Sequence, residues 1–87
     1  MALNYKEVQA LGKFNLELID ENLKKYGEGS PEYNHLMMRR GLIEKAIRLA
    51  YVEGNQRPLV ALDSNMARVI NDALAESRSE ESVENLL

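Results

Sequence analysis

The chain has 87 residues, of which 45% are hydrophobic and 29% are charged, and its formal net charge is −3 at pH 7. This length allows one domain, and the composition lies far from the low hydrophobicity and high charge that keep chains disordered. The acidic balance gives no general attraction to polyanions, so we do not expect the protein to bind nucleic acid.

The absence of cysteine excludes disulfides, thiolate metal sites and cysteine nucleophiles. The opening stretch MALNYKEVQAL lacks the basic start and continuous apolar core of a signal peptide. No stretch approaches the roughly 20 apolar residues that a membrane span needs. We therefore expect a soluble cytoplasmic protein without a membrane contact.

The first predicted helix covers residues 4–26. Asn4 followed by Glu7 is typical of a capping box, in which two side chains bind backbone amides at a helix start. One broad arc of the helical wheel is apolar and holds Val8, Leu11, Phe14, Leu18, Ile19, Leu23 and Tyr26. The pattern predicts an amphipathic helix that buries this arc.

The second predicted helix covers residues 31–53. Gly27 is expected to take a left-handed conformation after the first helix, Ser30 is placed as an N-cap, and Pro31 suits the first helical position. Gly54 and Pro58 end the helix. Its apolar arc spans about half the wheel and holds Leu36, Met38, Leu42, Ile43, Ala46, Ile47, Leu49 and Ala50. Such a wide arc predicts packing against two neighbours.

The third predicted helix covers residues 59–77, with a break left open at Asp63 and Ser64 because both residues prefer helix caps. Residues 78–87 form an acidic C-terminal tail, and residues 1–77 form a single helical domain. We expect an all-α fold, either a three-helix bundle or a helical hairpin plus a third helix, that associates with copies of itself.

Two asparagines, Asn15 and Asn22, lie one heptad apart near the centre of the first apolar arc. A buried amide without a partner costs on the order of 1 to 3 kcal/mol, so each must find a hydrogen bond. One interpretation is a self-association seam in which the amides fix the register. The alternative is that each amide binds a local carbonyl or lies at a thinly covered edge.

Two polar residues also interrupt the apolar arc of the second helix. His35 and Arg39 are four residues apart and share one side of it, and in an antiparallel hairpin Asn22 would be level with both. The end of the third helix, near Ser77 and Arg78, would reach the same layer. Asn22, His35 and Arg39 would then bind a small anion. The alternative is that Arg39 extends over the apolar edge into water and that His35 has no specific partner.

Another side of the second helix carries aromatic and methionine side chains, which are enriched at protein interfaces. Core packing in a small bundle explains the same residues equally well. Our candidates for contact with a protein partner are Tyr33, Met37, Arg40, Tyr51, Leu86 and Leu87.

Catalysis and metal binding find little support. Glu32 and His35 match the Glu-x-x-His spacing of di-iron carboxylate bundles, but Glu17 and Glu21 fall on the polar side of the first helix and supply no further ligand. With one histidine and no glycine-rich phosphate loop, we expect no enzyme, no cofactor and no metal. The basic residues of the second helix do not share one side, which argues against a DNA recognition helix.

The sequence therefore predicts a small non-enzymatic helical protein that regulates or inhibits another cytoplasmic protein through helix-face contacts, as a homo-oligomer. The alternative is a small-ligand binder that sequesters an anionic metabolite or nucleotide in the polar layer of Asn22, His35 and Arg39.

Overall fold

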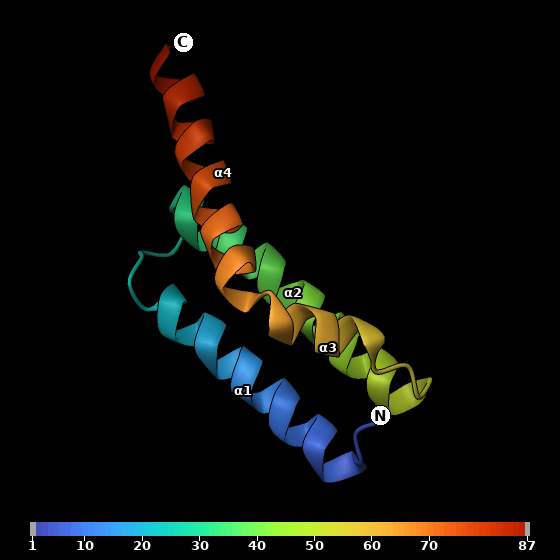
Figure 1. The fold of residues 1–87 in the computed structure, drawn as a ribbon. Coiled ribbons are helices and arrows are strands. Elements are labelled where there is room, and N and C mark those ends of the chain that lie inside the picture. Colours follow the sequence, from blue (N-terminus) through green and yellow to red (C-terminus); the bar gives the residue numbers. More distant parts are fainter. Residues whose placement is uncertain (1, 87) are drawn as a thin grey trace.

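The computed structural model describes residues 2–86, with side chains described up to residue 80. These residues form four helices and no strands: α1 (Tyr5–Leu23), α2 (Pro31–Val52), α3 (Arg57–Ser64) and α4 (Met66–Leu86). The all-α prediction is therefore confirmed. Helix α2 runs antiparallel to α1 on one side and to α3 and α4 on the other (Figure 1). The molecule is elongated, with extents of 50 × 20 × 20 Å.

The predicted starts of the first two helices are present. The Asn4 side chain accepts a hydrogen bond from the amide of Glu7 at 2.9 Å, and the Glu7 carboxylate accepts one from the amide of Asn4 at 3.2 Å. Ser30 accepts from the amide of Tyr33 at 3.2 Å. The prediction for Gly27 was wrong, because Gly29 takes the left-handed conformation with φ of 84°. The left-handed conformation is needed directly before the Ser30 cap, at a position that lies two residues after Gly27.

The predicted third helix is two helices. Helix α3 ends at Ser64, and Asn65 separates it from α4. The Asn65 side chain donates to the carbonyl of Ala61 at 2.8 Å, while its own carbonyl accepts from the amide of Val69 at 2.9 Å. Asn65 therefore lies at the end of α3 and at the start of α4. Helix α4 then continues beyond Ser77, so the tail predicted from residue 78 begins as helical backbone.

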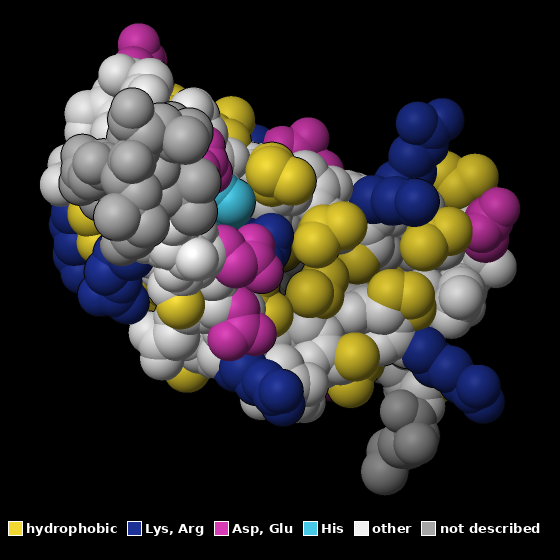
Figure 2. Space-filling model, turned by 90° about the horizontal axis from the view of Figure 1, so that it is seen from above, with side chains coloured by type: hydrophobic (Ala, Val, Ile, Leu, Met, Phe, Trp, Pro, Cys, Tyr) yellow, Lys and Arg dark blue, Asp and Glu magenta, His cyan; other side chains and the backbone are white. Residues whose placement is uncertain are grey.

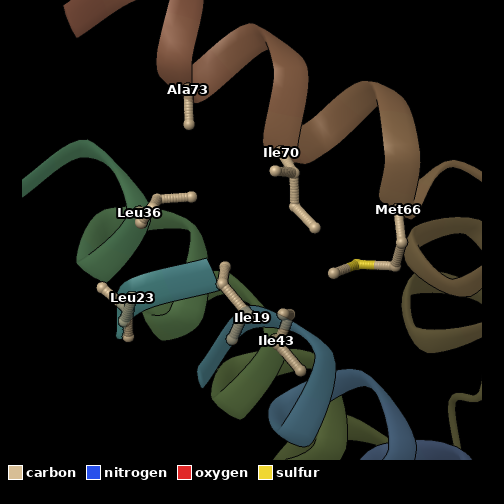
Figure 3. Close-up of a cluster of buried hydrophobic side chains, with 7 residues drawn as sticks. All are labelled: Ile19, Leu23, Leu36, Ile43, Met66, Ile70 and Ala73. Carbon is tan, nitrogen blue, oxygen red and sulfur yellow. The ribbon is translucent and has the colours of Figure 1, made fainter. Parts of the chain in front are cut away.

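The core lies where α2 packs between α1 and α4. Its larger cluster combines residues of these three helices, which point toward one another in Figure 3: Ile19, Leu23, Leu36, Ile43, Met66, Ile70 and Ala73. A second cluster near the other end of α2 consists of Val8, Ala46, Ala50 and Leu59. Burial of these apolar side chains is the main force that holds the four helices together.

Helix α2 nevertheless leaves part of its apolar arc uncovered. Met38 and Leu42 are 63% and 50% exposed, although Leu36 and Ile43 beside them are fully buried. Three helices pack on α2, but they cover only one side of the wide arc. Within the described residues, no helix combines the length and apolarity needed to cross a membrane.

Candidate binding surfaces

One uncovered apolar surface lies on α2 and α3. We call it the α2–α3 face and define it by Met38, Leu42, Lys45, Leu49, Val52, Pro58 and Leu62. Leu42, Leu49, Pro58 and Leu62 line one hollow between the two helices, and Leu49 and Val52 line a second hollow beside it. Figure 2 shows hydrophobic side chains gathered over this part of the molecule, with Lys and Arg side chains at their edge. A contiguous exposed apolar patch commonly marks an interaction site.

A third hollow, the α1–α3 groove, lies on the other side of α3. It is lined by Leu3, Glu7, Ala10, Leu11, Phe14, Val60 and Asp63. Phe14 is 57% exposed, although the sequence pattern placed it in the buried arc of the first helix. The helix α3 is only 8 residues long, and so it does not cover the full apolar arc of α1. The groove has an apolar floor and two carboxylates at its edges.

A polar cluster joins α2 to α4 and consists of His35, Arg39, Glu76 and Glu80. Nε2 of His35 lies 2.6 Å from the Glu80 carboxylate, and the Arg39 guanidinium lies 2.7 Å from the Glu76 carboxylate. His35 and Arg39 are four residues apart on α2, and Glu76 and Glu80 are four residues apart on α4. The two pairs therefore fit one register of antiparallel helices. The His35 and Arg39 side chains are only 17% and 16% exposed, so they are largely withdrawn from water.

The electrostatics of this cluster favour the ionised form of the Glu76 carboxylate. The Arg39 guanidinium, by its hydrogen bond and then its charge, holds the pKa of Glu76 below the ordinary glutamate value, with a smaller effect from His35. Nδ1 of His35 is buried and makes no hydrogen bond, although it lies 3.4 Å from Glu76. The short contact with Glu80 uses the other ring nitrogen, Nε2. The cluster thus ties α2 to the later turns of α4.

The polar layer predicted from the sequence is only partly assembled. His35 and Arg39 come together, but their partners are Glu76 and Glu80. Asn22 instead donates to the carbonyl of Leu18 at 2.9 Å, the local hydrogen bond that we considered as the alternative. The sequence analysis did not identify Glu76 and Glu80. Their spacing of four residues matches that of His35 and Arg39, which could have indicated that the two pairs meet on antiparallel helices.

Asn15 is the fully buried asparagine. Its side-chain nitrogen donates to the carbonyl of Leu11 at 2.9 Å and to the Asp63 carboxylate at 3.0 Å. The contact with Asp63 joins α1 to α3 beside the break at Asn65. The Asn15 amide therefore fixes the position of α3 on α1 within one chain.

The predicted partner contacts lie in different environments. Tyr33 packs against the larger core cluster, and Arg40 binds Asp20 of α1 at 2.8 Å and also pairs with Glu44. The hydrogen bond with Asp20 raises the pKa of Arg40 further above its usual range, and burial opposes this rise.

Met37 and Tyr51 are 41% and 39% exposed. The Tyr51 ring packs edge-on against Tyr5, with 5.2 Å between ring centroids. The side chain of Leu86, and all of Leu87, lie outside the described residues. Met37 and Tyr51 are therefore the predicted contacts that remain accessible among the described side chains.

No group of three or more potential metal ligands comes together among the described residues. Comparisons of the chain with models of protein families, with curated proteins and with solved structures gave no match. The features that can bear on function are therefore the two uncovered apolar surfaces and the polar cluster.

Proposed function

We propose that this protein is a non-enzymatic helical binding protein that regulates another cytoplasmic protein through contacts on its helix faces, and that it acts as a homo-oligomer. One observation carries the proposal: an 87-residue chain leaves two separate apolar surfaces, the α2–α3 face and the α1–α3 groove, exposed to water. Exposed apolar area that no part of the described chain covers favours association.

The α1–α3 groove supports a partner helix. Amphipathic helices bind by placing apolar side chains in a groove between two helices of the receptor. Phe14 and Val60 supply exposed apolar contacts, and Glu7 and Asp63 add negative charge at the edges. We therefore expect the regulated protein to present an amphipathic helix with basic residues beside its apolar stripe.

The proposal is tested by capture of partners on the tagged protein from an extract of its host. Phe14→Glu and Val60→Glu place a charge on the groove floor and are expected to abolish capture of the partner that the unaltered protein binds. Gln9→Glu is the matched control, because it adds the same charge to an exposed position of α1 outside the groove lining. A partner retained by all three variants would remove the groove from the proposal.

The other predicted contacts provide a second arm of the same experiment. If Met37→Ala or Tyr51→Ala abolishes capture while the groove variants retain it, the partner binds at the α2 surface that carries Met37 and Tyr51 and not in the groove. The folded state of each variant is checked by its far-UV circular dichroism and thermal midpoint.

The alternative function, a binder of an anionic metabolite or nucleotide, has weaker support. His35 and Arg39 would supply the positive charge, but Glu76 and Glu80 already bind them. A ligand anion must therefore displace two carboxylates of the same chain. An increase in the thermal midpoint with phosphorylated metabolites, lost in Arg39→Ala, would favour this alternative.

A further inference from the structure

The α2 side of the α2–α3 face has the spacing of a coiled-coil seam. Met38, Leu42, Lys45, Leu49 and Val52 follow one another at steps of four, three, four and three residues. This alternation keeps side chains on one stripe that can interlock with a second helix. Val52 is 73% exposed, and Met38 and Leu42 are at least half exposed, so the stripe faces water along most of its length.

The charges around this stripe are self-complementary. Lys45, Arg48 and Glu53 border the same hollow as Leu49 and Val52. None of the three charged side chains forms an ion pair with another residue whose side chain the structure describes. A surface that carries both signs of charge at two ends of an apolar centre can pair with an identical surface across a two-fold axis.

We infer that the occupant of the α2–α3 face is a second copy of this chain, with the two α2 helices antiparallel and the two-fold axis beside Leu49. Lys45 and Glu53 each lie four residues from Leu49, about 6 Å along the helix in opposite directions. The axis therefore places Lys45 of each copy level with Glu53 of the other. Because α2 ends at Val52, the two helices overlap only through their last two turns, with Leu49 and Val52 at the apolar centre, and Met38 and Leu42 lie beyond the end of the partner's α2. A parallel pair would instead place Lys45 against itself, and like charges at an interface are unfavourable.

This inference rests on the proposed function, because it names the surface through which the homo-oligomer forms. The α2–α3 face and the α1–α3 groove share no lining residue. The copies thus associate through one surface while the groove stays open to the regulated protein. A dimer of this kind presents two grooves, which strengthens binding to a partner that carries two matching helices.

The test is sedimentation of the purified 87-residue protein at micromolar to about 100 micromolar concentration, with charge-reversed variants. The unaltered protein is expected to be a dimer. Lys45→Glu alone and Glu53→Lys alone each create two like-charge contacts and are expected to raise the dissociation constant at least about tenfold. An equimolar mixture of these two variants restores both opposite-charge contacts, and it is expected to sediment as a heterodimer.

Lys25→Glu is the matched control, since it makes the same charge change at an exposed position outside the face; it is expected to leave the dimer unchanged. Circular dichroism of every variant shows whether it is folded. Because the chain has no cysteine, Leu49→Cys provides a second measurement: it is expected to give a disulfide-linked dimer on mild oxidation, whereas Lys25→Cys is not.

Three results would overturn the inference: a monomer at all concentrations, single variants that dimerise as well as the unaltered protein, or a mixture that remains monomeric. The experiment uses purified protein alone, so its failure does not decide whether Phe14→Glu loses the partner. Conversely, a dimer with the expected charge dependence stands even if the groove variants retain capture.

Discussion

A pair of glycine substitutions tests the packing of α1 against α2. A Cβ atom at Gly12 would lie 2.9 Å from Cγ1 of Ile47, closer than real Cβ contacts come, and 3.0 Å from Cδ1 of Ile47, tighter than most of them. A Cβ atom at Gly41, also in a helix interior, would meet no atom within 4 Å. The same substitution, glycine to alanine, therefore has a steric penalty at one position only.

The expected magnitudes follow from two opposing terms. Alanine is favoured over glycine in a helix interior by about 1 kcal/mol, and this gain applies at both positions. Overpacking of a closely packed site costs about 1 to 3 kcal/mol, and this cost applies only at Gly12. We expect Gly41→Ala to raise the free energy of unfolding by about 1 kcal/mol, and Gly12→Ala to leave it unchanged or lower it by up to about 2 kcal/mol.

The assay is urea unfolding followed by circular dichroism, with all variants at one protein concentration. In an Ile47→Ala background the clash is absent, so Gly12→Ala should become stabilising, which a double-mutant cycle detects. Equal stabilisation by Gly12→Ala and Gly41→Ala in the unaltered background would refute the close approach of α1 to Ile47.

Three further predictions concern polar contacts. Asn15→Ala removes a fully buried amide that bridges two helices, and urea unfolding should show a loss of about 1 to 3 kcal/mol; a smaller loss would contradict the bridge. Arg40→Ala should cost about 1 kcal/mol or less, because its ion pair with Asp20 is partly exposed; a larger loss would mean that the pair is better shielded than the structure indicates. Because Arg39 lowers the pKa of Glu76, their contact stabilises the fold above the ordinary glutamate pKa of about 4.3 and loses this effect as pH falls through the lowered value. Glu76→Gln should therefore reduce the fall of the thermal midpoint in acid, and an unchanged pH profile would count against the cluster.

Helix identity and helix starts were predictable because they depend on neighbours in the sequence. Asn4 and Ser30 cap helices through amides no more than three residues away, and the break beside Ser64 follows from local preferences for caps. Apolar periodicity likewise predicted that Ile19, Leu36 and Ile43 would be buried. Each of these features requires only the geometry of a single helix.

Which apolar residues stay exposed was decided by the tertiary structure. A helical wheel cannot show that α3 is too short to cover Phe14, or that α1, α3 and α4 together cover only part of the apolar arc of α2 and leave Leu42 in water. The partners of His35 and Arg39 were also beyond a single-helix argument, because Glu76 and Glu80 reach them only once α4 lies antiparallel on α2. The periodicity of the sequence determines which side of each helix is apolar. The lengths of the helices, the turns between them and the register of their packing determine which part of that side is buried.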